Sequence, residues 1–121
     1  MSAIDDKTRV QHIRDAAQKI ITFTEGKERS ALAEDDMLQL ALVRLVEIIG
    51  EAAARLSDDL KTKHSDIPWA AIVGMRNRLV HAYFDIDLDV VWDTVTMAVP
   101  DLLKQVETIL ETDYSNGDTE S

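Results

Sequence analysis

The sequence predicts an all-α protein, built as an up-and-down bundle of four to five helices. Apolar residues recur at spacings of three and four along most of the chain, which is the period of an amphipathic helix. The strict apolar–polar alternation of a half-buried strand is absent. The chain has 121 residues, of which 45% are apolar and 30% charged, so it can bury the core of one domain.

The first two helices are expected at residues 4–25 and from about residue 30–35 to residue 56. Gly26 ends the first of them. The second carries two apolar rows, which consist of Leu38, Leu42, Leu45, Ile49, Ala52 and Leu56 in one row and Met37, Ala41 and Ile48 in the other. So wide an apolar face predicts that this helix is covered on more than one side.

The second half of the chain is divided by two prolines. The stretch "SDDLKTKHSDIP" reads as a polar loop. Pro68 then suits the first turn of a third helix, which is expected to run to about His81. The acids of "FDIDLD" suit the positive end of a fourth helix. Pro100 lies inside this last helix and should kink it or split it into two.

The domain is expected to span residues 1–112, followed by a flexible acidic tail at residues 113–121. The start of the chain lacks the apolar run of a signal peptide, and no segment approaches the roughly 20 apolar residues of a membrane span. We therefore expect a cytoplasmic protein with no membrane contact. Without cysteine, and with three histidines scattered along the chain, no metal site or cofactor is expected.

Positive charge is concentrated in one segment of an acidic chain. The net charge is -10, which argues against broad electrostatic binding of nucleic acid. Residues 61–81 nevertheless carry four basic side chains against one acid. This segment contains most of "GMRNRLVHAYF", so a local basic surface is expected around it.

Arg76 lies where a helical bundle would normally place a leucine, on an apolar stripe of the third helix. It could simply extend its head into water, and His81 could simply stabilise a helix C-terminus. On a continuous helix the two side chains differ by roughly 140°. They converge only if the helix ends near His81 or if a second copy of the chain supplies the complement. Asn77, four residues before His81, could face it, with Gly74 leaving room.

Together these residues would be sufficient for cleavage of RNA without a metal. A histidine can take or give a proton near neutral pH, and a guanidinium stabilises a phosphate whose charge is growing. Asn77 could orient either group. The ribose 2′-hydroxyl would attack the adjacent phosphate, so DNA would resist. Glu51 could pair with Arg76 or Arg78, or could remain solvated.

The motif resembles a known family. "GMRNRLVHAYFDID", with "IPWAAIVG" before it and "VVW" after it, is similar to the HepT family of HEPN-domain ribonuclease toxins. The family signature is arginine, four residues, histidine, one residue and tyrosine, and Arg76, His81 and Tyr83 have that spacing. "IIGEAAARLS" also resembles the family's Gly-Glu-Ala segment. The resemblance covers about residues 4–112.

The resemblance implies an all-α homodimer in which the two motifs face each other. It implies that Arg76 and His81 are catalytic in a metal-independent endoribonuclease, the toxin of a type VII-like toxin–antitoxin system. It also implies a minimal nucleotidyltransferase antitoxin that silences the toxin by AMPylation of Tyr83. Asn77 and Arg78, with Glu51, would support the site.

Two other interpretations stay open. The chain could be a non-catalytic HEPN subunit that binds nucleotide or docks a nucleotidyltransferase, or it could be a purely structural helical dimer. Tyr83 could simply pack on the apolar stripe with its hydroxyl at the edge.

Overall fold

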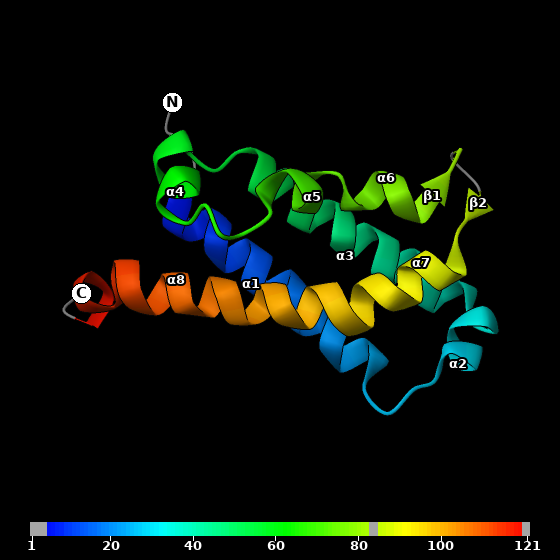
Figure 1. Cartoon of the computed structure of the whole chain (residues 1–121). Helices are drawn as coiled ribbons and strands as arrows, with labels where there is room; N and C mark the ends of the chain where they lie inside the picture. The colour runs from blue at the N-terminus through cyan, green and yellow to red at the C-terminus, as the bar shows by residue number, and fades with distance from the viewer. Residues whose placement is uncertain (1–4, 83–84, 120–121) are drawn as a thin grey trace.

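Three long helices form the body of the molecule (Figure 1). They are α1 (Asp6–Thr24), α3 (Asp36–Ala54) and α8 (Val99–Thr119). The computed structural model describes residues 5–82 and 85–119, with side chains up to residue 114. Helix α1 packs against both α3 and α8. The fold is therefore an all-α bundle of the HEPN type, as the sequence predicts.

The first predicted helix is confirmed almost to the residue. Asp5 caps α1 by accepting a hydrogen bond from the Thr8 amide. The apolar positions on one face of α1 are buried, and they are Val10, Ile13, Ala17 and Ile20. The second predicted helix instead begins as a separate short helix, α2 (Arg29–Ala33). Asp35 then caps α3 through the Leu38 amide.

The expected polar loop after α3 contains a helix, so that prediction was wrong. Helix α4 (Asp58–Lys63) begins where the Ser57 hydroxyl accepts from the Leu60 amide. Acidic residues lie in its first turn and lysines in its last, which suits the helix dipole. It buries Leu60 as its single core residue, so no apolar period marked it in the sequence.

The third predicted helix is shorter than expected and is divided. It consists of α5 (Trp69–Val73) and α6 (Met75–Leu79), joined at Gly74. The chain then becomes extended as β1 (Val80–His81), which pairs antiparallel with β2 (Asp85–Ile86). The helix ends at Leu79, slightly before the predicted end near His81, so His81 itself is in extended backbone. The short hairpin was not predicted.

The predicted disturbance near Pro100 is present, and it takes the form of a π-helical turn. Helix α7 (Leu88–Asp93) continues through η1 (Thr94–Ala98) directly into α8. The Val99 amide donates to the Thr94 carbonyl, five residues back. Pro100, which has no amide hydrogen, then falls in the first turn of α8.

Helix α8 extends beyond the predicted domain end at residue 112 and reaches Thr119. Asp113 bonds to residues of α4 and its C-cap, and Tyr114 packs against the core. The part of the predicted tail nearest residue 112 is therefore helical and packed.

Gly50 allows α3 and α5 to approach closely. A Cβ atom at Gly50 would lie 3.1 Å from the Val73 carbonyl oxygen. Close packing of α5 on α3 therefore explains a glycine inside this helix. Gly74 differs, because a Cβ there would meet only its own turn, at 3.5 Å from the Ala70 carbonyl oxygen. Its predicted role in close approach to Asn77 and His81 is not observed.

The two ends of the bundle carry different features (Figure 1). Helix α4 and the last turns of α8 lie at one end, and α2, α7 and the β1–β2 hairpin lie at the other. Within residues 5–82 and 85–119, no helix is both long enough and apolar enough to cross a lipid bilayer.

Candidate nuclease site

Arg76 lies on the side of α6 that packs against α3. Its Nε atom is 3.8 Å from Oε2 of Glu47, whose Oε1 lies 2.5 Å from Nη1 of Arg44. The Nε atom is buried and makes no hydrogen bond within the described residues, whereas 39% of the side chain is exposed. Arg76 is therefore held against α3 by packing and a long ion pair. Its guanidinium keeps hydrogen-bonding capacity for an anion.

Glu47 is a site residue that the sequence reasoning missed. Glu51, which could have paired with Arg76 or Arg78 or remained solvated, is exposed and lies 4.0 Å from Arg44. Glu47 is one helical turn before Glu51, so the two lie on the same face of α3. The resemblance pointed to Glu51 through the Gly-Glu-Ala segment, and that segment does not include Glu47.

His81 lies in β1 and is mostly exposed, at 62% of its side chain. Its Nε2 atom is 3.1 Å from Oδ2 of Asp87. The other carboxylate oxygen of Asp87 accepts from the Val90 amide at 3.2 Å and so caps α7. The sequence predicted this cap, but it did not predict the bond to His81.

The contacts of Asp87 determine which ring nitrogen of neutral His81 carries the proton. The hydrogen bond with His81, followed by that from the Val90 amide, lowers the pKa of Asp87 below its ordinary value. Asp87 is thus an anion at neutral pH and can only accept hydrogen bonds. In neutral His81 the proton therefore belongs on Nε2, and Nδ1 carries the free lone pair.

The backbone directly after His81 is unusual. Ala82 has φ of 58°, in the left-handed region that favours glycine. For an alanine this costs on the order of 1 kcal/mol. The pairing of His81 with Asp85 across the hairpin accompanies this conformation. The position of His81 is therefore set by the hairpin and by Asp87 rather than by a helix.

The other residues that were predicted for the site on α6, Asn77 and Arg78, lie on different sides of this helix. Arg78 donates from Nη2 to the Ala71 carbonyl at 3.1 Å and lines a pocket against α8, away from Glu47. Asn77 is exposed between the two arginines, and the helix ends too early for it to face His81. In the part of the chain that the structure describes, no hydrogen bond or ion pair joins Arg76 to His81. Tyr83 lies outside the described residues.

A second histidine–carboxylate pair lies at the opposite end of the bundle. His64 Nε2 is 2.9 Å from Asp113 Oδ2, and Lys63 Nζ is 3.2 Å from Oδ1. Burial raises the pKa of Asp113, but hydrogen bonds from His64, Thr112 and Lys63 outweigh it, and the net pKa is lowered. This pair fastens α8 to α4 and is separate from the motif.

Comparison with known proteins identifies the class of this bundle and motif. The family model described as "Ribonuclease HepT-like" matches residues 13–109. The chain therefore belongs to the HepT-like ribonuclease family.

Curated relatives agree with this assignment over nearly their whole length. The chain is 37% identical to "Putative RNase TTE0752" of Caldanaerobacter subterraneus subsp. tengcongensis, over 84% of this chain and 91% of the relative. It is 37% identical to "Probable ribonuclease HepT" of Thermococcus cleftensis, over 84% and 92%. It is 36% identical to "Putative RNase MJ1380" of Methanocaldococcus jannaschii, over 90% and 100%. No solved structure matches the chain significantly.

Proposed function

We propose that the protein is a metal-independent endoribonuclease and the toxin of a type VII-like toxin–antitoxin system in the cytoplasm. One observation carries the proposal. An exposed imidazole, His81, has one ring nitrogen held by a carboxylate and follows by five residues a guanidinium that is only loosely paired. Membership of the HepT-like ribonuclease family supports it.

Each group has a role that its surroundings support. His81, through the free lone pair of Nδ1, removes the proton of the ribose 2′-hydroxyl. The 2′-oxygen then bonds to phosphorus, and the bond from phosphorus to the 5′-oxygen breaks, which leaves a 2′,3′-cyclic phosphate. The 5′-oxygen takes up a proton from a second acid. Arg76 stabilises the charge that grows on the phosphoryl oxygens.

A homodimer would bring two such motifs to one groove, and each imidazole could then act as acid for the other. The outer face of α3, the helix that also carries Glu47, supports this arrangement. Met37 and Leu40 on that face are 81% and 63% exposed, which is unusual for large apolar side chains in a small domain. Burial of these side chains would favour association.

A nucleotidyltransferase partner would silence the toxin by transferring AMP to Tyr83. This tyrosine follows His81 by two residues. The hydroxyl oxygen would bond to the α-phosphorus of ATP, and pyrophosphate would leave. The added nucleotide would bring bulk and negative charge to the place where an RNA phosphate must bind. Incubation with ATP and the cognate transferase should add one AMP to the wild type and none to Tyr83→Phe.

Cleavage of RNA in EDTA tests the nuclease assignment directly. The Arg76→Ala and His81→Ala variants should each lose about 100-fold or more in rate. The matched controls are Arg14→Ala and His12→Ala on α1, which should cleave as the wild type does. Cleavage that survives both motif substitutions would refute the site. If wild-type protein binds a nucleotidyltransferase but never cleaves RNA, it is a docking subunit.

A further inference from the structure

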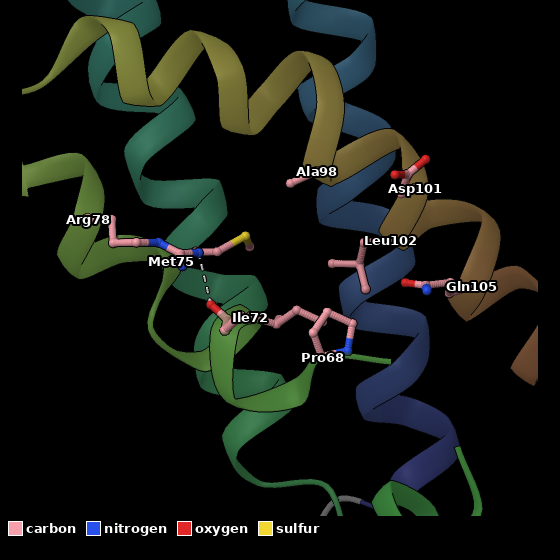
Figure 2. Close-up of a pocket in the computed structure, with 9 residues that line it drawn as sticks. Pro68, Ile72, Met75, Arg78, Ala98, Asp101, Leu102 and Gln105 are labelled. Atoms are coloured by element: carbon pink, nitrogen blue, oxygen red, sulfur yellow. Dashed lines mark hydrogen bonds between the residues drawn. The ribbon is translucent and has the colours of Figure 1, made fainter. Parts of the chain in front are cut away.

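A pocket of about 250 Å³ lies between the α5–α6 segment, which carries the motif arginines, and the η1–α8 segment. Figure 2 shows Arg78 and Met75 on one side of it and Ala98, Asp101, Leu102 and Gln105 on the other. Pro68 and Ile72 lie between the two sides. The lining is apolar except for one guanidinium, one carboxylate and one amide. No step of the proposed chemistry uses this pocket.

The geometry of α6 connects the pocket to the candidate nuclease site. Met75 and Leu79 are buried and anchor this five-residue helix. Between them, three consecutive polar residues face outward, and at 100° per residue they cover an arc of roughly 200°. Arg76 at one end of the arc approaches α3, and Arg78 at the other end lines the pocket. Asn77 is exposed in the middle.

The two arginines are about 3 Å apart along the helix axis, and they lie on opposite sides of it, roughly 200° apart. An RNA strand that crosses the outer surface of α6 could therefore place a phosphate at Arg76 and a neighbouring base at Arg78. We propose that this pocket binds one base of the RNA substrate, next to the phosphate that is cut. This inference rests on the proposed nuclease function and deepens it.

The chemistry of the lining fits a base better than a phosphate or an aliphatic side chain. The apolar walls can cover the faces of an aromatic ring, and the Ala71 carbonyl holds Arg78, whose guanidinium plane can stack on a base. Asp101 repels phosphate but accepts hydrogen bonds from exocyclic amino groups. Gln105 can both donate and accept, and an aliphatic occupant would leave these groups unpaired.

The size of the pocket sets the size of its occupant. Pockets for drug-sized ligands typically measure roughly 300–1,000 Å³. A cavity of about 250 Å³ therefore suits one ring system rather than a whole nucleotide. Because a carboxylate accepts hydrogen bonds and cannot donate them, adenine, cytosine and guanine, which carry amino groups, should be preferred to uracil.

The test has two parts. A protein variant fills the pocket with a side chain, and a modified RNA substrate lacks the base. Ala98→Phe places a ring in the cavity from an exposed position. Met97, the neighbour of Ala98 in the same π-helical turn, is largely exposed and does not line the pocket. Met97→Phe is therefore the matched control. The RNA oligonucleotides carry one cleavage site, and the neighbouring nucleotide either has a base or is abasic.

Wild type and Met97→Phe should cleave the oligonucleotide with the base about tenfold or more faster than the abasic one. Ala98→Phe should cleave both at the slower rate. Asp101→Asn should lose the preference for amino-bearing bases over uracil, through slower cleavage of the oligonucleotides whose base carries an amino group. Anisotropy with 2′-O-methyl RNA, which has no free 2′-hydroxyl to react, should show the same base dependence in binding.

The outcomes separate this inference from the nuclease proposal. If Ala98→Phe retains the wild-type preference for a base, or if wild type cuts abasic RNA equally fast, the base pocket is overturned and the nuclease stands. If Ala98→Phe instead loses only the binding of a protein partner, the pocket is a docking surface and the inference fails. If wild type binds 2′-O-methyl RNA with base dependence but cleaves nothing, base binding stands, whereas the nuclease and the place of the pocket beside a cut phosphate both fall. If it neither binds nor cleaves RNA, both fail.

Discussion

The two oxygens of Asp87 accept hydrogen bonds from different elements, since one holds His81 and the other caps α7. Asp87→Asn separates these roles. An asparagine still caps a helix, so the thermal midpoint should change little. Its amide would donate to Nε2 of His81 and favour the tautomer whose Nδ1 is protonated. We expect RNA cleavage to fall about 100-fold because the free base is lost.

Asp85→Asn, on the facing strand of the hairpin, is the control for Asp87 and should remain active. Nitrogen-15 spectra of His81 report the tautomer directly. Unchanged spectra together with unchanged cleavage in Asp87→Asn would show that Asp87 does not position the ring.

Asp113 offers a test of stability that is independent of activity. Its side chain is only 9% exposed, and it accepts from Lys63 and His64. Because its pKa in the folded state is lowered, it contributes stability above its ordinary pKa of 3.8, which is lost as pH falls through the folded-state value. Asp113→Asn should reduce the free energy of unfolding at pH 7 by about 1–3 kcal/mol.

Urea unfolding of Asp113→Asn and wild type should converge as pH falls below 3.8, the ordinary pKa of the group. The exposed neighbour Glu111 is the control, and Glu111→Gln should shift stability by less than about 0.5 kcal/mol. An undiminished difference in acid would contradict the assigned charge pairing.

At the scale of single residues, the sequence predicted the motif residues but not all of their contacts. It identified Arg76 and His81 as candidates from their chemistry and spacing. It did not find Glu47 as the partner of Arg76, because several acids on α3 share one face and only packing selects among them. It found Asp87 as a cap, but its second contact depends on a hairpin that the periodicity did not reveal.

At the scale of elements, the two glycines beside α5 should respond in opposite directions to alanine. Gly50→Ala would gain about 1 kcal/mol of helix propensity but would push a methyl group to 3.1 Å from the Val73 carbonyl. Relief requires α5 to move as a whole, so we expect net destabilisation by about 1–2 kcal/mol.

Gly74→Ala meets only ordinary contacts, at 3.5 Å, and its φ of -88° suits alanine. It should stabilise the protein by about 0.4–1 kcal/mol. Chemical unfolding of both variants measures the difference. A stable Gly50→Ala variant would mean that α3 and α5 are less tightly packed than the contact indicates.

The long helices were predictable and the short ones were not. Helices α1, α3 and α8 have 19 to 21 residues, long enough for an apolar period to repeat several times. Helices α5 and α6 have five residues each and were read as one. Two-residue strands such as β1 and β2 carry no periodicity. The motif therefore lies in the part of the fold that sequence patterns describe least well.

At the scale of the whole molecule, the exposed apolar end of α3 predicts association. Met37→Asp combined with Leu40→Asp should convert a dimer to a monomer, because two charges would have to be buried in the interface. Light scattering after gel filtration should show the mass fall by half. RNA cleavage should fall with it if two motifs share one groove.

Met97→Asp, at another exposed apolar position, is the control for the dimer test and should leave the mass unchanged. A wild-type protein that is monomeric at micromolar concentration would contradict the dimer.

The π-helical turn at Thr94–Ala98 holds one residue more than an α-helical bonding pattern needs there. Loss of a single codon within it would let the backbone close as an ordinary helix. The start of α7, where Asp87 meets His81, would keep nearly its present direction, because a π-turn absorbs one added residue with little rotation of the helix before it. A reading-frame-preserving deletion at this turn should thus be tolerated, whereas the same deletion inside the regular part of α8 would rotate everything before it by about 100°.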